Sequence, residues 1–411
     1  MECLWILATI LFFQYLVSSI SLACTARKST SRKLCILSLL ILAVFEIHCL
    51  SFLPGPELQR AVIAFSCIVK LLHFISIFLI LQVEIHQLVQ TVSGSFLTSL
   101  RAGLNCVTST RGIGTPWEVI SWPHCREPTK GQYIANAIIV LSWQYLALDF
   151  LNFGALKYFH HNWPDTLAAG AEFLNPKSTK EQLMARIPLS CILVANLRLL
   201  FAMIYGVLAT VSVLLNFNSP KDWPPLFGSM RHLRTFSIRS FWGKYWHQLL
   251  RWPLVTISTY IRQRLSLCNS VSRHVQSMTD LFLIFCLSGF LHLLSAVYAG
   301  VPDSLGAIFL FFITVPLLIM LEDAYRVRVG GTTHSRRMDT LGFLWALAWL
   351  YACVPWFAYT ALRLPVNKNA MMPFSFVESF GSQAVMTMVL SGGIIWALWV
   401  DGRPVGEQEV G

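Results

Sequence analysis

Nine apolar runs, each long enough to cross a bilayer as a helix, divide the sequence and leave it few ways to fold. They cover residues 1–24, 34–52, 61–82, 133–153, 188–215, 279–299, 304–321, 341–361 and 383–400. The runs are continuous and lack the alternation of outer-membrane strands. Because backbone amides within a bilayer must be satisfied inside the segment, such runs predict helices of about 20 residues. We therefore predict an all-α, polytopic membrane protein with about nine transmembrane helices.

The composition agrees with this fold class. Of the 411 residues, 55% are hydrophobic and only 12% are charged, whereas soluble domains average about 25% charged residues. The spans use most of the chain, so we expect one membrane-embedded domain over residues 1–411. The first run has no basic segment before it and is longer than the apolar core of a signal peptide, which predicts a membrane helix.

The positive charges predict the orientation. If residues 25–33 lie in the cytosol, 22 of the 31 Lys and Arg residues fall on that side and 7 on the other. Cytoplasmic loops carry such an excess. We therefore expect a multi-pass protein of the endoplasmic reticulum, with a lumenal N-terminus and a cytosolic C-terminus. The net charge of +11 is then a property of the loops, and we expect no nucleic-acid partner.

The 11 cysteines are scattered and form no CxxC pair or Cys/His spacing typical of a metal site. We read them as small buried hydrophobic residues and expect no metal and no redox cofactor. The chain also lacks visible internal repeats and paired broken helices, which are typical of transporters. A transporter therefore stays the weakest functional alternative.

The longest loop between spans, 216–278, holds nine Lys and Arg residues and is predicted to be cytosolic. It contains SFWGKYWHQLLRW, which starts at Ser240. At 100° per residue, the segment 240–251 separates its large apolar side chains from its polar ones, which predicts an interfacial helix with aromatic anchors. Two interpretations of His247 remain open: a polar residue at the membrane surface, or a residue that the helix presents to a reaction chamber.

A second histidine, His292, lies deep within the apolar run 279–299. It shares a helix face with Ser288 and Ser295 and with two alanines, while Phe and Leu occupy the other faces. Ionisable side chains in a bilayer are costly and are usually paired or functional. His292 is therefore either a hydrogen-bonded residue between helices or a general base that faces a tunnel.

Further ionisable residues lie within the spans. Lys70 and His73 are three residues apart and could pair with Glu46 on a neighbouring helix. We expect structural pairing or snorkelling for these residues and for Arg198.

Three stretches together resemble a known family. SFWGKYWHQ (240–248), followed by the membrane-embedded SGFLH (288–292), resembles the wax-synthase-like branch of the membrane-bound O-acyltransferases. The stretch TSTRGIGTPWEV (108–119) resembles the upstream signature of the fungal members, which acetylate terpenoid and meroterpenoid alcohols. The resemblance covers roughly residues 100–400 and is more specific for the superfamily than for the substrate.

This resemblance implies a helical fold with an internal tunnel, which acyl-CoA enters from the cytosol and a hydrophobic alcohol from the membrane or the far side. The family's membrane histidine maps onto His292, and a second site residue, often Asn in other branches, maps onto His247. Lys244 and Arg251 in the basic loop are candidates for binding CoA phosphates, as is Arg111. Acetyl-CoA would be the co-substrate, with no permanently bound cofactor.

The chemistry of the site residues fits that role. An alcohol that attacks a thioester must lose its proton, and an imidazole kept neutral by an apolar environment can accept it. The oxyanion that develops needs a donor, for which His247 or a neighbouring indole N–H is available. The donor's chain length stays open, so a long-chain wax ester synthase is the main alternative to an acetyltransferase.

Overall fold

The computed structural model describes residues 2–53, 55, 57–88, 95–118, 128–162, 164–228, 237–265, 272–301, 305–328, 336–363 and 374–401. In these ranges every regular element is a helix, so the all-α prediction is confirmed. The chain forms two compact units. The first comprises Met1–Ile120, Gln248–Leu341 and Leu364–Val366; the second comprises Ser121–His247, Gly342–Arg363 and Asn367–Gly411.

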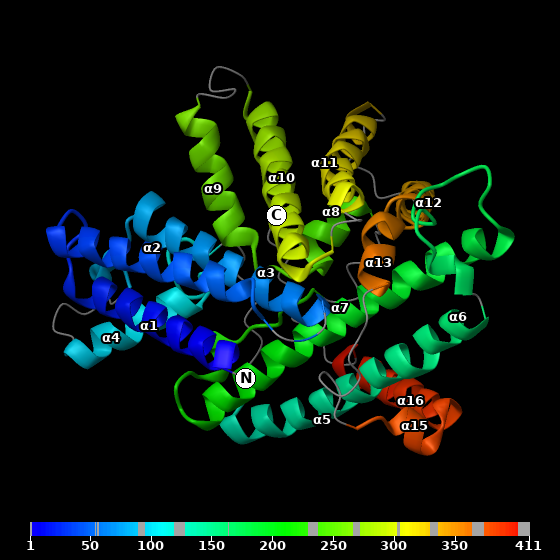
Figure 1. Cartoon of the computed structure of the whole chain (residues 1–411), viewed down its shortest axis with the longest axis horizontal. Helices are drawn as coiled ribbons and strands as arrows, with labels where there is room; N and C mark the ends of the chain where they lie inside the picture. Colours follow the sequence, from blue (N-terminus) through cyan, green and yellow to red (C-terminus); the bar gives the residue numbers. More distant parts are fainter. Residues whose placement is uncertain are drawn as a thin grey trace. The chain divides into compact units, whose positions relative to one another are not determined.

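In the first unit, helix α10 is packed by three partners. It contacts α3, α9 and α11, while α1 packs against α2 and α4 (Figure 1). The helices of this unit are α1 (Glu2–Cys24), α2 (Thr30–Leu50), α3 (Glu57–Phe74) with its π-helical extension η1 (Ile75–Ile80), η2 (Ile85–Gln87), α4 (Phe96–Thr108), α9 (Arg251–Arg264), α10 (Arg273–Ala299) and α11 (Leu305–Arg328).

The second unit is built around the long helix α7 (Lys180–Leu214), which packs against α5 (Lys130–Asp149) and α13 (Val354–Leu362). Helix α16 (Ser382–Asp401) lies on α5. Helix α12 (Arg336–Ala352) starts in the first unit and ends in the second. The shorter helices are η3 (Phe150–Leu156), α6 (Lys157–Asn162), η4 (Pro164–Leu167), η5 (Pro220–Asp222), α8 (Ile238–Ser240), η7 (Phe241–Tyr245) and α15 (Phe376–Phe380).

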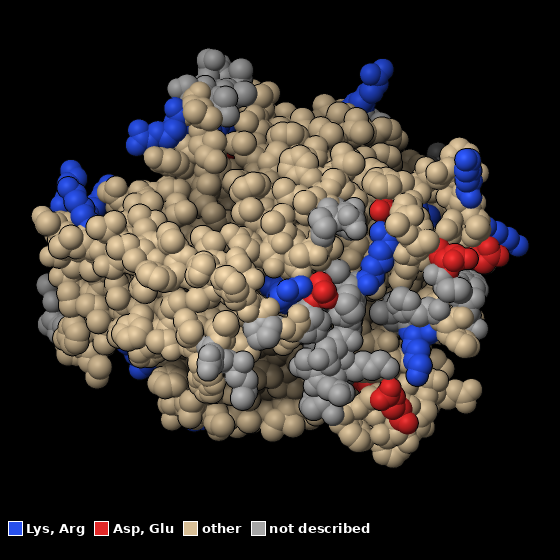
Figure 2. Space-filling model, viewed as in Figure 1, with Lys and Arg blue, Asp and Glu red and all other residues tan. Residues whose placement is uncertain are grey.

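Seven of these helices are long and apolar enough to cross a membrane, and the pair Thr340–Ala352 and Val354–Leu362, bent by 43°, brings the number to eight if it is counted as one span. They coincide with eight of the nine predicted runs. The ninth run, 383–400, lies within α16, whose side chains after residue 393 fall outside the described residues. Charged side chains are sparse on the face seen in Figure 2. The protein is therefore a multi-pass membrane protein, as predicted.

The boundaries of two spans follow from their caps. Helix α7 starts at Lys180, before the predicted run, because Thr179 and Gln182 form a capping box and Pro188 is accommodated inside the helix. Helix α10 starts after Ser272, whose side chain accepts a hydrogen bond from the Val275 N–H. It ends at Gly300, whose φ of +76° is the left-handed conformation that glycine adopts at low cost.

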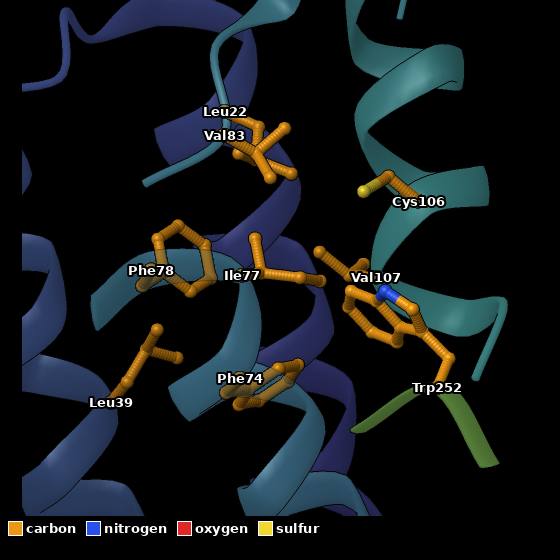
Figure 3. Packing of buried hydrophobic residues seen from close by; sticks show 9 residues of the cluster. All are labelled: Leu22, Leu39, Phe74, Ile77, Phe78, Val83, Cys106, Val107 and Trp252. Atoms are coloured by element: carbon orange, nitrogen blue, oxygen red, sulfur yellow. The ribbon is translucent and has the colours of Figure 1, made fainter. Parts of the chain in front are cut away.

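A buried cluster in the first unit joins α1, α2, α3, η1 and α4 with the start of α9. Trp252 of α9 is 2% exposed and inserts its indole beside Val107 of α4 (Figure 3). The members of the cluster are Leu22, Leu39, Phe74, Ile77, Phe78, Val83, Cys106, Val107 and Trp252. This packing fixes the start of α9, which is the end of the segment SFWGKYWHQLLRW.

A buried ion pair also holds the first unit together. Both carboxylate oxygens of Glu46 lie 2.6 Å from Nζ of Lys70, and the amide of Gln14 contacts both groups. The predicted pairing of Lys70 with Glu46 is therefore confirmed. The pairing of His73 is wrong: its Nε2 lies 3.0 Å from the carbonyl oxygen of Cys106. That carbonyl, in the last turn of α4, has no amide partner further along the helix, so the imidazole satisfies it.

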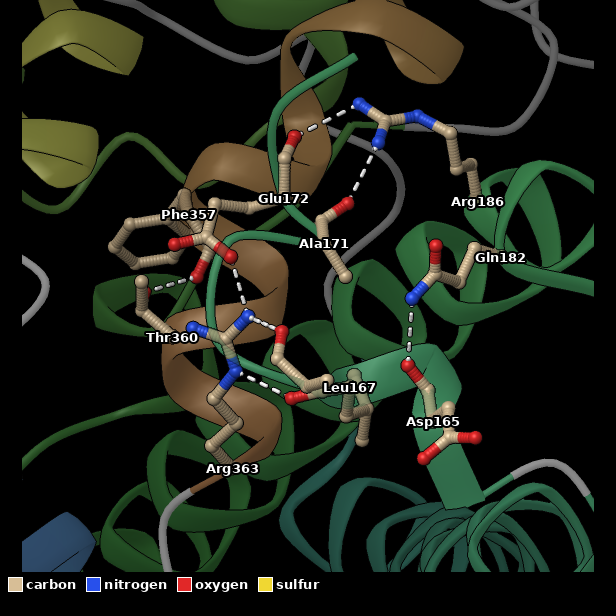
Figure 4. Close-up of polar contacts among 10 residues, drawn as sticks. Asp165, Leu167, Ala171, Glu172, Gln182, Arg186, Phe357, Thr360 and Arg363 are labelled. Carbon is tan, nitrogen blue, oxygen red and sulfur yellow. Dashed lines mark hydrogen bonds and ion pairs between the residues drawn. The ribbon is translucent and has the colours of Figure 1, made fainter. Parts of the chain in front are cut away.

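Two arginines of the second unit tie the segment before α7 to the helices around it (Figure 4). Arg186, 1% exposed, donates to the carbonyls of Ala171 and Glu172. Arg363 donates to the Leu167 carbonyl and to the Glu172 carboxylate. Burial alone would raise the pKa of Glu172, but the hydrogen bond and the charge of Arg363 lower it below its usual value.

Candidate active site

His292 lies in α10, and its ring has a defined tautomer. Nδ1 is 2.8 Å from the backbone oxygen of Ser288, one turn earlier. A carbonyl oxygen only accepts hydrogen bonds, so this contact requires the proton on Nδ1 and leaves the lone pair on Nε2. An imidazole with its lone pair on Nε2 is equipped to act as a base through that atom.

The polar stripe around His292 is packed inside the first unit. Ser295, Ala296 and Ala299 are at most 7% exposed, and α10 packs against α3 and α11. The ring of His292 itself lies 4.6 Å from that of Phe65 on α3 and 4.4 Å from that of Phe312 on α11. The stripe therefore directs this histidine toward neighbouring helices and away from lipid.

The segment 240–251 is not one helix, which corrects the prediction. The π-helix η7 ends at Tyr245, Trp246 has extended backbone angles (φ −71°, ψ 160°), and α9 begins only at Arg251. A helical wheel assumes 100° per residue throughout, and the wider π-turn and the extended residue break that periodicity. The separation of apolar and polar residues on the wheel therefore does not describe this segment.

Three aromatic side chains of this segment, which were predicted to be lipid anchors, are instead buried in the protein. Phe241, Tyr245 and Trp246 are 5%, 6% and 8% exposed. Phe241 stacks on Trp246 with ring centroids 5.4 Å apart and lies at the same distance from Trp349 of α12. A helix face rich in aromatic residues can pack in a protein core or lie at the headgroup boundary of a membrane. In this segment the aromatic side chains pack in the core.

His247 lies among aromatic rings of the second unit. Its ring centroid is 5.4 Å from that of Phe201 on α7, 5.9 Å from Phe227 and 5.3 Å from Trp246. The side chain is only partly exposed. These contacts agree with the interpretation in which the segment dips into the protein, and they disagree with a histidine on the polar face of a surface helix.

Arg198 lies on α7, one turn before Phe201, and does not snorkel. Its guanidinium carbon is 4.6 Å from the ring centroids of both Phe227 and Tyr245, and Nη2 donates to the Gly228 carbonyl at 3.3 Å. Gly228 is required there, since a Cβ would lie 2.0 Å from the Lys244 carbonyl oxygen. The predicted structural pairing therefore takes the form of cation–π contacts, which hold the chain beside His247.

The stretch RGIGTPW forms a turn that folds onto its own tryptophan. Gly112 and Gly114 have φ of +63° and +73°, and a Cβ on Gly112 would lie 2.9 Å from the ring of Trp117. Trp117 in turn stacks on Trp252, at 6.2 Å between ring centroids. Arg111 is 7% exposed. Val119, the last residue of the predicted motif, lies outside the described residues.

The predicted site residues are divided between the two units. His292, Arg251 and Arg111 belong to the first, and His247 and Lys244 to the second. Within the first unit, Leu250 and Leu254 on either side of Arg251 share a buried cluster with Leu291, the neighbour of His292. Arg251 is partly buried and donates to Gln248 at 3.1 Å, whereas Lys244 is exposed.

Several residues around the site were not predicted from the sequence. They are Phe65 and Phe312 beside His292, Phe227 near His247, and Trp252 under the RGIGTPW turn. The sequence around each of these residues does not indicate a role at the site, because the residues that they contact lie far along the chain.

Comparison with known proteins identifies the class of enzyme. The model of the membrane bound O-acyl transferase family matches residues 223–314, which include both the His247 and the His292 motifs. The resemblance that the motifs SFWGKYWHQ and SGFLH predicted is confirmed over this range, and the chain is similar to acyl-CoA-dependent O-acyltransferases of the membrane-bound type.

The similar proteins are fungal. Acetyltransferase pyr8 of Aspergillus fumigatus is 29% identical over 84% of this chain and 85% of its own length. Acetyltransferase nanB of Aspergillus nanangensis is 28% identical over 96% and 99%. Acetyltransferase TRI7 of Fusarium sporotrichioides is 28% identical over 70% of each chain. No solved structure matches the chain.

Proposed function

We propose that this enzyme transfers the acetyl group of acetyl-CoA to a hydroxyl of a terpenoid or meroterpenoid alcohol in fungal secondary metabolism. The names of the similar proteins support acetyl as the transferred group. The stretch 108–119 supports the same choice, because it resembles the upstream signature of the fungal members of the family.

The observation that carries the mechanism is the hydrogen bond between Nδ1 of His292 and the Ser288 carbonyl, at 2.8 Å. Nε2 accepts the proton of the alcohol while the alcohol oxygen attacks the thioester carbon. The tetrahedral intermediate then collapses, the C–S bond breaks, and the imidazolium returns the proton to the leaving thiolate. The products are the acetate ester and CoA, and no covalent acyl-enzyme is needed.

We assign roles to the other site residues from the chemistry of their side chains. His247, or an indole N–H near it, donates to the oxyanion that forms on the thioester carbonyl. Lys244, which is exposed, and Arg251 attract the phosphates of CoA from the cytosolic side, and Arg111 is a weaker candidate because it is 7% exposed. In this proposal the enzyme lies in the endoplasmic reticulum with its C-terminus in the cytosol, where acetyl-CoA is available.

Donor selection tests this function. Microsomes that contain the protein, supplied with a panel of terpenoid alcohols, are expected to use radiolabelled acetyl-CoA at least about tenfold better than palmitoyl-CoA in kcat/KM. A preference for palmitoyl-CoA would instead make the protein a wax ester synthase. Absence of transfer from either donor, with correctly folded protein, would leave the transporter reading as the better one.

Replacement of His247 tests the second site residue. We expect His247→Ala to lower kcat about 100-fold, because an oxyanion donor is lost. His247→Asn is expected to retain most of the rate, since a side-chain amide can still donate. Initial rates per folded enzyme are measured for both variants. If both keep the wild-type rate, His247 has only a structural role.

A further inference from the structure

The ring of His292 is held by three separate helices of the first unit. Its own helix, α10, supplies the Ser288 carbonyl. Phe312 of α11 stacks on one side at 4.4 Å with an angle of 27° between the rings, and Phe65 of α3 lies at 4.6 Å with an angle of 47°. The imidazole is therefore in contact with one group from each of three helices.

The three contacts restrict different motions of the imidazole. The hydrogen bond holds Nδ1 but allows the ring to tilt about that bond. The stacked ring of Phe312 fixes the plane of the imidazole, and the ring of Phe65 limits its swing toward α3. Together they fix the direction of the Nε2 lone pair, which a general base needs for proton transfer.

We propose that Phe65 and Phe312 are positioning residues, which orient His292 for proton transfer from the alcohol. The proposal rests on the proposed function, in which His292 is the base. Neither phenylalanine touches the reacting atoms in this scheme. Their effect is exerted through the imidazole alone.

Gly289 gives the proposal independent support. A Cβ at this position would lie 2.8 Å from Cβ of Phe312 and 3.5 Å from Cδ2 of Phe309. Because Cβ of Phe312 is attached directly to its backbone, α11 would have to move away from α10 to make room. The glycine of SGFLH therefore permits the approach that brings Phe312, 3% exposed, onto the histidine three residues further on.

The alternative is that both phenylalanines only fill the core. Phe65 does contact the cluster of Ile68, Val69, Leu250, Leu254 and Leu291. Core filling predicts a loss of folded protein without a change in the rate of the protein that remains folded. Positioning predicts a lower kcat per folded enzyme at unchanged KM, so the two accounts are separable.

The test compares aliphatic and aromatic replacements. Phe65→Leu and Phe312→Leu are expected to lower kcat about 10- to 100-fold per folded enzyme, with KM for acetyl-CoA within about twofold of wild type. Gly289→Ala is expected to do the same, since it displaces Phe312. Phe65→Tyr keeps the ring contact at a partly exposed position and is expected to retain kcat within about threefold.

Phe285→Leu is the matched control, because Phe285 is 7% exposed on α10 and lies two turns before His292. It is expected to lower the amount of folded enzyme but not kcat. If Phe65→Leu and Phe312→Leu also keep the wild-type kcat while His292→Ala is inactive, the two phenylalanines are not positioning residues. His292 then remains the proposed general base. If His292→Ala retains acetyl transfer, His292 is not the general base, and the proposal that Phe65 and Phe312 position it is wrong as well.

Discussion

His292→Ala is expected to lower kcat for acetyl transfer by about 10²- to 10⁴-fold, the usual contribution of a general base. The methyl group of alanine cannot take the hydroxyl proton, and no other group in the scheme replaces it. His292→Gln is a closer test, because its amide can still donate to the Ser288 carbonyl but offers no basic nitrogen. Initial rates with radiolabelled acetyl-CoA, divided by the amount of folded protein, measure both effects.

His73→Ala is the matched control for this experiment. His73 is also buried in a span, with 0% exposure, and is bonded to the Cys106 carbonyl. Its loss leaves that carbonyl short of a donor and is expected to cost about 1–3 kcal/mol of stability while kcat per folded enzyme stays unchanged. A His292→Ala protein that transfers acetyl at the wild-type rate would rule out His292 as the base.

The spans could be predicted because their signal is local. A continuous run of apolar residues specifies a membrane helix whatever it later packs against, and eight runs were found at their positions in this way. His292 was found for the same reason, since an ionisable group in an apolar run is conspicuous by itself. The tautomer of its ring was not predictable, because it depends on the rotamer that brings Nδ1 to Ser288.

The segment 240–251 shows where local reasoning fails. Phe241 and Trp246 suit an interfacial helix by composition, but their burial depends on Trp349, which lies far along the chain. The π-helical turn and the extended backbone at Trp246 likewise follow from tertiary packing. Phe65 and Phe312 escaped notice because a phenylalanine in a span carries no signal of its own, and only the fold brings both rings to one histidine.

Lys70→Met is expected to destabilise the protein by about 3–5 kcal/mol, because it leaves the Glu46 carboxylate buried without its cation. Glu46 is 0% exposed and Lys70 is 4% exposed, so water cannot take the place of the missing partner. The amide of Gln14 can still donate to the carboxylate, at 3.0 Å, but a neutral donor does not balance a full charge. The loss of stability is measured by heating the detergent-solubilised protein to a series of temperatures. The protein that remains folded is quantified by size-exclusion chromatography.

The double variant Glu46→Gln with Lys70→Met distinguishes loss of charge balance from loss of packing. It removes both charges, and the amide at position 46 can still hydrogen-bond to Gln14, so much of the lost stability is expected to return. Lys33→Met, which removes an exposed cation from α2, should change stability by no more than about 0.5 kcal/mol. If Lys70→Met is as mild as Lys33→Met, the ion pair is not what holds α2 and α3 together. If the double variant is as unstable as Lys70→Met, the shape of the lysine side chain, rather than its charge, stabilises this part of the first unit.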